Sequence, residues 1–320
     1  MKAIVQDRFG SPDVLDYRDI EDPAVGDNDV LVRVHAAGCG PDVWHLMTGL
    51  PYFVRLMPGF RKIWGHPRGR DVAGVVDAVG ANVTGLAPGD EVMGIAEGSF
   101  AELSVGKAEL LVPKPARLSF EEAAAAPISG LTALQAIRDV AKVEAGQRVL
   151  VIGAGGGVGT LTVQVAKASG AHVTGVASTS KLELVRSLGA DEAIDYTREQ
   201  LTDRWDAIVD TAGRRPLSVL RKLLTPTGAL AIVGGEGGGK WTAGFFRQIL
   251  RAPLLSLVTK QRLRPVVSTE NAEDLRALAE LIERGDVTPV VGRTFPLIEA
   301  ADAIRYLERG HAAGKVVVTV

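Results

Sequence analysis

The sequence has little of several features that define particular classes of protein. Cys39 is the only cysteine in 320 residues, which excludes an intramolecular disulfide and a four-cysteine structural zinc site. Aromatic residues make up only 5% of the chain, and no stretch approaches the roughly 18 to 20 apolar residues of a membrane span. The N-terminus lacks the apolar core of a signal peptide. These absences predict a cytoplasmic protein with no membrane segment.

Neither sign of charge dominates. The 36 Lys and Arg residues are balanced by 38 Asp and Glu residues, which gives a formal net charge of −2. No overall field therefore draws the chain to nucleic acid or to an anionic membrane. A small uncharged or amphiphilic substrate fits this balance better. The length of the chain predicts two domains that share a substantial core.

The chain divides into two patterns of residues. In the first 120 residues, β-branched runs such as Val30–Val34 and Val72–Val79 alternate with Gly, Pro and Asp, which predicts a β-rich domain. Ser119-Phe-Glu-Glu122 has the form of a helix capping box, so we place a domain boundary near residue 121. Residues 288–320 follow without a linker and are predicted to pack back on the β-rich domain.

Short apolar runs alternate with helical patterns beyond residue 121. Runs this apolar suit parallel strands that helices cover on both faces, which predicts a doubly wound α/β sheet over residues 122–287. The β-rich domain then consists of residues 1–121 and 288–320. The predicted strands are 149–152, 172–176, 192–195, 207–210 and 229–233, and the predicted helices are 158–169, 181–188 and 216–224.

A glycine-rich turn joins the first of these strands to its helix. Gly153-Ala-Gly-Gly-Gly-Val-Gly159 follows Arg148–Ile152, and the order of strand, turn, helix and strand matches a Rossmann dinucleotide-binding unit. Residues without Cβ let the backbone approach a pyrophosphate, and the helix N-terminus points its N–H groups at that charge. Two registers fit, Gly153-x-Gly155 and Gly153-x-x-Gly156-x-x-Gly159. The predicted cradle is lined by Gly153, Gly156, Gly157, Val158 and Gly159.

The end of the second predicted strand carries no acid. An NAD site usually has an Asp or Glu there, and Val176–Lys181 has none. Ser178, Thr179 and Ser180 can donate hydrogen bonds to a 2′-phosphate, and Lys181 can offset its charge, so the segment predicts NADPH as the cofactor. The alternative is that the hydroxyls cap the next helix and that Lys181 is solvated.

Further motifs complete a family resemblance. With the glycine turn, they resemble the medium-chain dehydrogenase/reductase superfamily, specifically its zinc-free quinone oxidoreductase branch. The resemblance implies a GroES-like catalytic domain built from both chain ends, a Rossmann domain between them, and an active-site cleft at their junction. The motifs are Val32-Arg-Val-His-Ala-Ala-Gly38, Gly69-Arg-Asp-Val-Ala-Gly-Val-Val76, Pro88-Gly-Asp-Glu-Val92, Gly98-Ser-Phe-Ala-Glu102 and Ile128-Ser-Gly-Leu-Thr-Ala133.

The resemblance also raises the question of zinc. In zinc-dependent relatives a His binds the metal where this chain has Arg70, so a cation replaces a ligand. Cys39 lies near the family's first ligand, and Asp71 together with His45 or His66 could complete a set of three. Because Arg70 would repel a dication, we expect Cys39 to be a buried apolar residue and the site to hold no zinc. A zinc-dependent alcohol dehydrogenase is the alternative.

The predicted chemistry follows from the expected lack of zinc. Oxidation of a simple alcohol needs a Lewis acid, whereas hydride transfer to a quinone or an α,β-unsaturated carbonyl needs mainly a hydrogen-bond donor. Apolar residues from Trp44 to Trp64 correspond to the family's substrate-cleft wall and predict a pocket for a flat or long apolar substrate, with core packing as the alternative. Within this wall, Tyr52 is the candidate proton donor.

The resemblance assigns further residues and a quaternary state. It implies a homodimer formed along the last Rossmann strand, with residues 254–267 at the edge. We therefore predict a zinc-independent, NADPH-dependent oxidoreductase that reduces a small apolar or aromatic quinone, enone or related conjugated carbonyl; a non-catalytic NADPH-binding sensor is a further alternative. By resemblance, Thr132 faces the nicotinamide, Tyr196 lies near the 2′-phosphate, and Gly234 and Gly235 lie beside the nicotinamide ribose.

Overall fold

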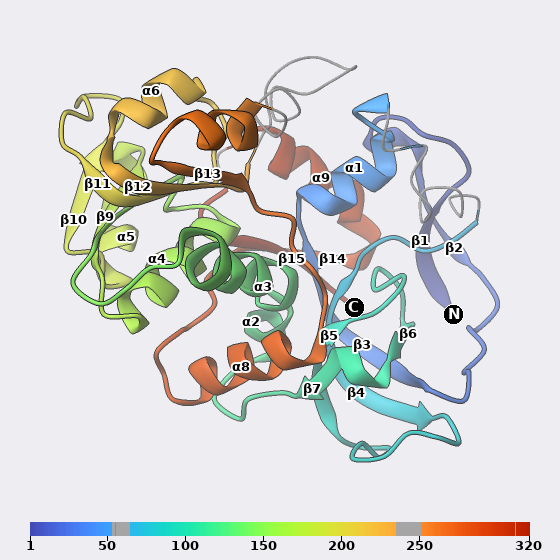
Figure 1. Cartoon of the computed structure of the whole chain (residues 1–320). Helices are drawn as coiled ribbons and strands as arrows, with labels where there is room; N and C mark the ends of the chain where they lie inside the picture. The colour runs from blue at the N-terminus through green and yellow to red at the C-terminus, as the bar shows by residue number, and fades with distance from the viewer. Residues whose placement is uncertain (53–54, 56–64, 235–250, 311) are drawn as a thin grey trace. The chain divides into compact units, whose positions relative to one another are not determined.

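The computed structural model describes residues 1–52, 55, 65–234, 251–310 and 312–320 (Figure 1). The chain divides into two compact units. Unit 1 consists of Met1–Ile128, Glu270–Gly285 and Pro289–Val320, and unit 2 consists of Ser129–Thr269 and Asp286–Thr288. In the described ranges, no helix is both long and apolar enough to cross a membrane.

Unit 2 is built on a six-stranded parallel sheet. The strand order is β10-β9-β8-β11-β12-β13. Strands β9 and β10 therefore lie on one side of β8 and strands β11 to β13 on the other, so the strand order reverses between β8 and β11. Helices α4 and α5 lie against one face, and α6 lies against the other (Figure 1). The predicted doubly wound sheet is confirmed. Its strands are β8 (Arg148–Ile152), β9 (His172–Ala177), β10 (Glu192–Asp195), β11 (Trp205–Asp210), β12 (Leu224–Ile232) and β13 (Arg262–Pro265).

The helices of unit 2 follow the predicted pattern. The last strand, β13, lies within residues 254–267, where the family resemblance placed the edge of the sheet, but the apolar pattern of the sequence does not indicate it. In β13 only Leu263 is fully buried, and two arginines flank it, so this edge strand lacks an apolar run. Residues 251–258 before it are helical. The other helices are α3 (Pro127–Gln135), which begins in unit 1 and continues as the π-helix η4 (Ala136–Ala141), α4 (Gly157–Ala168), η5 (Thr179–Lys181), α5 (Leu182–Ser187) and α6 (Leu217–Lys222).

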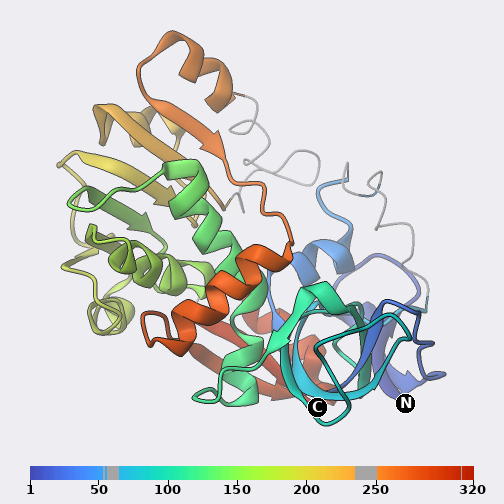
Figure 2. The same ribbon diagram turned by 60° about the horizontal axis from the view of Figure 1, so that its bottom comes forward.

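Unit 1 contains both ends of the chain and a curled, mostly antiparallel sheet (Figure 2). The sheet order is β14-β15-β3-β4-β5-β7, and β6 also pairs with β3. The C-terminal strand β15 lies antiparallel to β3 and parallel to β14. The strands are β1 (Lys2–Gln6) and β2 (Leu15–Asp19), which pair separately, β3 (Asp29–Cys39), β4 (Asp71–Val79), β5 (Glu91–Ile95), β6 (Leu103–Lys107), β7 (Leu111–Pro113), β14 (Val291–Pro296) and β15 (Lys315–Thr319).

The helices of unit 1 include one whose start was predicted from its cap. At α2 the Ser119 hydroxyl accepts a hydrogen bond from the Glu122 N–H at 3.2 Å, and the Glu122 carboxylate accepts one from the Ser119 N–H at 2.9 Å. The predicted capping box is therefore present. The helices are α1 (Pro41–Thr48), α2 (Phe120–Ala124), α8 (Ala272–Glu283) and α9 (Ala300–Glu308), with short turns η1 (Pro12–Val14), η3 (Ala108–Leu110) and η6 (Leu297–Glu299).

Helix α8 belongs to unit 1, although its residues lie within the range 122–287 that was predicted as the central domain. The helix buries Leu275, Leu278 and Ile282, and it packs beside β7. Arg117 donates a hydrogen bond to the carbonyl oxygen of Ile282 at 2.8 Å. The apolar face of α8 therefore completes unit 1, although the helix lies between the last strand of unit 2 and residues 286–288 in the sequence.

A buried ion pair joins β15 to β4. Lys315 Nζ lies 2.8 Å from Asp71 Oδ2, and the two side chains are 5% and 1% exposed. Burial by itself lowers the pKa of Lys315, but the charges of Asp71 and Asp42 raise this pKa above its ordinary value. A Cβ on Gly38 would lie 2.6 Å from Asp71 Oδ2 and 2.7 Å from a backbone oxygen. Glycine at position 38 therefore makes room for the ion pair.

Replacement of Lys315 by Met should destabilise the protein strongly. The variant keeps an apolar stem but leaves Asp71 as a buried charge without its cation, which costs about 3 to 5 kcal/mol in comparable proteins. Lys107→Met is the matched control, because Lys107 forms an exposed pair with Asp29 and such pairs contribute little. Urea unfolding of the two variants checks this expectation. An equal loss of stability in both would contradict it.

Candidate functional site

The carboxyl ends of β8 and β11 lie side by side in unit 2, at the point where the strand order reverses. In doubly wound sheets, ligands bind outside the carboxyl ends of the strands at this point. The glycine turn follows β8, and Thr211 follows β11. The candidate site is therefore built from the loops at this edge.

Two glycines in the turn are required by the backbone. Gly153 has a φ of 83°, which residues with a Cβ rarely adopt. A Cβ on Gly159 would lie only 2.0 Å from the carbonyl oxygen of Gly153. At Gly156 a Cβ would meet that oxygen at 3.5 Å, an ordinary contact, and at Gly155 it would meet the flexible side chain of Lys181. The geometry therefore requires glycine at positions 153 and 159, and the register of the cofactor-binding glycines stays a prediction.

Helix α4 begins within this turn. Gly156 is the N-cap, and the Thr160 N–H donates to the Gly156 carbonyl at 2.9 Å. The N–H groups of Gly157, Val158 and Gly159 come before this bond, so they have no acceptor within the helix. No acidic residue lies in the first turn of α4. The arrangement suits an anion such as a pyrophosphate, and the assignment of these residues to cofactor binding stays a prediction.

Two more loops pack against the glycine turn. The Thr211 hydroxyl donates to the carbonyl oxygen of Ile152 at 2.8 Å. A Cβ on Gly234 would lie 2.1 Å from the carbonyl oxygen of Thr211, so the loop after β12 closely approaches the loop after β11. Asp210 accepts the N–H groups of the two residues after Thr211, and burial raises the pKa of its carboxyl group. Gly235 lies outside the described residues.

The residues predicted to bind a 2′-phosphate lie at the end of β9 and in η5. A Cβ on Gly155 would lie 2.7 Å from Lys181 Cδ, so the stem of Lys181 covers the glycine turn. Burial lowers the pKa of Lys181. Ser178 is half-buried, Thr179 is exposed, and Tyr196 after β10 is 50% exposed. These groups are grouped at one edge of unit 2 because β9 and β10 pair in parallel.

The structure adds a carboxylate to this region. Asp195, the last residue of β10, accepts a hydrogen bond from the Thr179 hydroxyl. The segment Val176–Lys181 itself contains no Asp or Glu, but the pairing of β10 with β9 places the Asp195 carboxylate beside it. Asp195 was not among the residues predicted from the sequence to lie at this site. The strand order of a Rossmann sheet, which puts the third strand beside the second, is the signal that could have found it.

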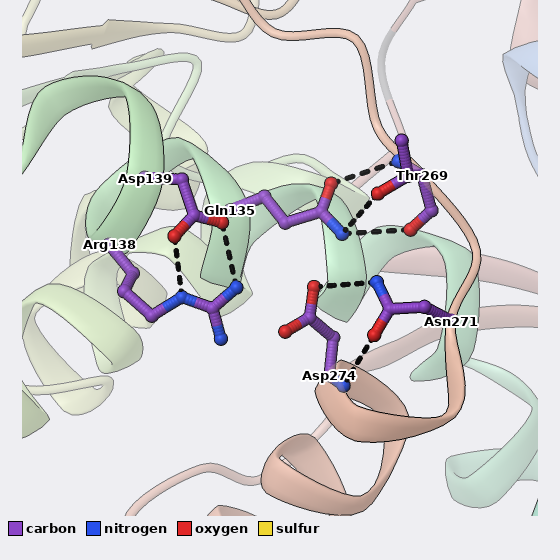
Figure 3. Close-up of polar contacts among 6 residues, drawn as sticks. All are labelled: Gln135, Arg138, Asp139, Thr269, Asn271 and Asp274. Atoms are coloured by element: carbon purple, nitrogen blue, oxygen red, sulfur yellow. Dashed lines mark hydrogen bonds and ion pairs between the residues drawn. The ribbon is translucent and has the colours of Figure 1, made fainter.

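Helix α3 carries Thr132 and is held to the segment after β13. The Gln135 side chain donates to the Thr269 carbonyl at 2.8 Å and accepts from the Thr269 N–H at 2.9 Å (Figure 3). Thr132, one turn earlier, is 9% exposed. Within unit 2, Gln135 therefore fixes the last turn of this helix. Figure 3 also draws two local contacts, the Arg138–Asp139 ion pair and the Asn271–Asp274 cap of α8.

The predicted substrate wall in unit 1 is described only in part. Met47 is fully buried, and the indole N–H of the half-buried Trp44 donates to Glu308 at 2.7 Å, so both residues belong to the core of unit 1. Tyr52 is half-buried, and the Arg55 guanidinium lies 4.7 Å from the centre of its ring. Five other residues of the wall lie outside the described residues, namely Phe53, Leu56, Met57, Phe60 and Trp64.

The residues around Cys39 do not fit a zinc ion. Burial raises the pKa of the Cys39 thiol to about 12, so the metal-free thiol is protonated at neutral pH. The Asp71 carboxylate is paired with Lys315, and Arg70 lies 2.6 Å from Glu270. A dication here would be repelled by both cations. Among the described residues, no group of three or more His, Cys, Asp or Glu could hold a metal ion.

Comparisons with known proteins agree with this architecture. Residues 26–116 match the family model of the alcohol dehydrogenase GroES-like domain, and residues 188–318 match that of the zinc-binding dehydrogenases. The chain is 36% identical to the chloroplastic NADPH-dependent alkenal/one oxidoreductase of Arabidopsis thaliana, over 99% of this chain and 79% of that protein.

Two solved structures are similar over nearly their whole length. The quinone oxidoreductase from Coxiella burnetii has a TM-score of 0.86 and 30% identity, and the match covers 100% of this chain and 99% of that one. Mycobacterial Rv1454c, solved as a complex with NADPH, has a TM-score of 0.84 and 27% identity, with 100% of both chains covered.

Replacement of Gly159 by Ala should disrupt the glycine turn. The added Cβ would overlap a backbone oxygen that cannot move without displacing the end of β8, so we expect a loss of about 1 to 3 kcal/mol. Gly156→Ala is the matched control, because its Cβ makes only an ordinary contact. Thermal and urea unfolding of both variants measure the difference. A Gly159→Ala protein as stable as Gly156→Ala would show that the turn is not packed in this way.

Proposed function

Because the chain is an oxidoreductase of the medium-chain dehydrogenase/reductase superfamily, in its quinone oxidoreductase-like branch, we propose that it reduces a quinone, an enone or a related conjugated carbonyl with NADPH and without zinc. The observation that supports this proposal is the tightly packed glycine turn Gly153–Gly159, which leads into α4 at the switch point of a Rossmann sheet and suits an anion. The names of the Arabidopsis and Coxiella proteins support an enone or a quinone as the acceptor.

The residues that would hold the cofactor fit a dinucleotide with a 2′-phosphate. The N–H groups of Gly157, Val158 and Gly159 would bind the pyrophosphate, and Gly156 leaves the space in front of them open. Lys181 covers the turn and carries the cation that a 2′-phosphate requires. NADPH is proposed over NADH on this basis. By the family resemblance, Gly153, Thr132, Ser178, Tyr196, Gly234 and Gly235 complete the contacts, and Thr179 lies beside Ser178 with its hydroxyl bonded to Asp195.

The protein's own part in the reaction is positioning and proton supply. Bound NADPH supplies the hydride, so the chain has to orient the acceptor and exclude water. In a conjugated acceptor, negative charge develops on an oxygen away from the carbon that is reduced, and one hydrogen-bond donor can neutralise it. We assign this role to the Tyr52 phenol, which lies beside the Arg55 guanidinium. The domain of residues 1–121 and 288–320 is proposed as the catalytic part, and that of residues 122–287 as the cofactor-binding part.

The chain is further proposed to act as a cytoplasmic homodimer. Apolar side chains are exposed around β13, at the edge of the six-stranded sheet. An edge strand with exposed apolar neighbours favours pairing with a second copy. The exposed residues are Leu254 (64%), Leu257 (81%), Val258 (78%) and Val267 (75%).

Purified protein should oxidise NADPH in the presence of quinones or enones. Conjugated acceptors should react faster than saturated aldehydes, because no metal polarises an isolated carbonyl. NADPH should be preferred to NADH, and neither a chelator nor added zinc should change the rate. The absorbance of the reduced nicotinamide measures the rate with each acceptor, with each dinucleotide, and with the chelator or added zinc. Lack of activity with every acceptor would support a non-catalytic NADPH-binding protein, and activity that a chelator abolishes would contradict zinc independence.

Replacement of Tyr52 by Phe should lower turnover by roughly a hundredfold, the usual contribution of a general acid. The KM for NADPH should change little, because the phenol is assigned to the acceptor and not to the cofactor. Tyr17→Phe is the matched control, since Tyr17 also lies beside a cation, Lys2, at 5.7 Å, but is 40% exposed on another part of unit 1. Equal turnover in the Tyr52→Phe and Tyr17→Phe variants would rule out this role.

A further inference from the structure

The buried carboxylate of Asp195 connects two segments, η5 and the residues after β10, which lie at the adenosine end of the proposed cofactor site. Asp195 is 2% exposed. It accepts the Thr179 hydroxyl from η5, and it also accepts the Thr197 N–H at 2.9 Å and the Thr197 hydroxyl at 2.7 Å. These hydrogen bonds hold the pKa of Asp195 below its ordinary value, so the group is an anion at neutral pH.

The two threonine hydroxyls have no proton left to donate. A hydroxyl carries one donor and two lone pairs, and both protons here point at Asp195. Thr179 and Thr197 oxygens lie 3.4 Å apart, and they can offer only lone pairs to an approaching anion. A phosphate group therefore gains no hydrogen bond from Thr179, although this residue is exposed at the end of β9.

An exposed cation lies near this carboxylate. Arg198 Nε lies 3.9 Å from Asp195 Oδ2, and the arginine side chain is 75% exposed. Lys181 extends from the same turn as Thr179 and covers Gly155. Arg198 therefore offsets the carboxylate in part, but a dianionic phosphate placed at this edge still interacts unfavourably with Asp195.

We propose that Asp195 is a positioning and specificity-determining residue, which withholds the Thr179 hydroxyl from the 2′-phosphate of NADPH and so limits the preference for NADPH over NADH. The proposal rests on the proposed function, because it concerns the same cofactor site. Asp195 contacts Thr179 and Thr197 rather than the cofactor, so it acts through these residues. Ser178, Lys181 and Arg198 are left to bind the 2′-phosphate.

The Asp195→Asn variant tests this role. The amide oxygen can still accept from Thr197, while the amide nitrogen cannot accept from Thr179, so the Thr179 hydroxyl becomes free to donate and a negative charge is lost. The ratio of the dissociation constants for NADH and NADPH, measured by nicotinamide fluorescence, should rise at least about fivefold. Asp203→Asn is the control, because it removes an exposed carboxylate paired with Arg148. An unchanged or lower ratio in Asp195→Asn would overturn the proposal.

Thr179→Val in both backgrounds gives a second, independent readout. Thr179→Val should lower the ratio of the dissociation constants for NADH and NADPH in both proteins. The change should be at least about fivefold larger in the Asp195→Asn protein than in the wild type, because only there can the Thr179 hydroxyl donate its proton to the phosphate. If Asp195→Asn does not fold, Thr179→Val and Thr179→Ser are compared in the wild type. If Thr179→Val alone weakens the affinity for NADPH more than about fivefold and leaves the affinity for NADH unchanged, the proposal is overturned.

The kinetic signature separates positioning from general damage. In the Asp195→Asn variant, the KM for NADPH should fall while kcat on a fixed acceptor stays nearly the same. A misfolded variant would not show this combination. Wild-type protein that binds neither dinucleotide would overturn the proposed function itself. Binding of both dinucleotides with a ratio that Asp195→Asn leaves unmoved would overturn only the role of Asp195.

Discussion

The candidate site of this protein depends on the contact between Gly159 and the carbonyl oxygen of Gly153. No side chain fits between them, since a Cβ on Gly159 would lie 2.0 Å from that oxygen. The first turn of α4 therefore rests directly on the end of β8, and its N–H groups point out of the carboxyl edge of the sheet. The same close packing recurs where Gly234 approaches Thr211, so three loops share one edge because two glycines remove the atoms that would keep them apart.

Electrostatic compensation is handled differently in the two units. In unit 1, Asp71 is buried with Lys315, and Arg70 is paired with Glu270. Both carboxylates are therefore balanced by side-chain cations. In unit 2, Asp195 is balanced mainly by hydroxyl and N–H donors, with Arg198 at a longer distance. Donors that are bound to a carboxylate are no longer available to a ligand, which makes this buried group relevant to cofactor choice.

Much of the Rossmann sheet could be predicted from the sequence because its inner strands are buried on both faces and form short apolar runs. Glu192–Asp195 was predicted as observed, and the strand before the glycine turn also lies where it was predicted. Strand β13 and helix α8 could not be found in the same way. The edge strand has only one fully buried residue, and α8 presents its apolar face to unit 1 although the sequence places it after the strands of unit 2. Periodicity indicates that a face is apolar, but it does not identify the partner of that face.

The sequence by itself determined the class of fold, the glycine turn and the absence of an acid between Val176 and Lys181, because these follow from local residue types and their spacing. Only the tertiary structure decided which glycines are sterically required and which charges meet. Asp195 reaches Thr179 because parallel strands β9 and β10 end together, and Lys315 reaches Asp71 across 244 positions of the chain because β15 and β4 both flank β3. Such contacts depend on strand pairing between distant segments, which no local pattern encodes.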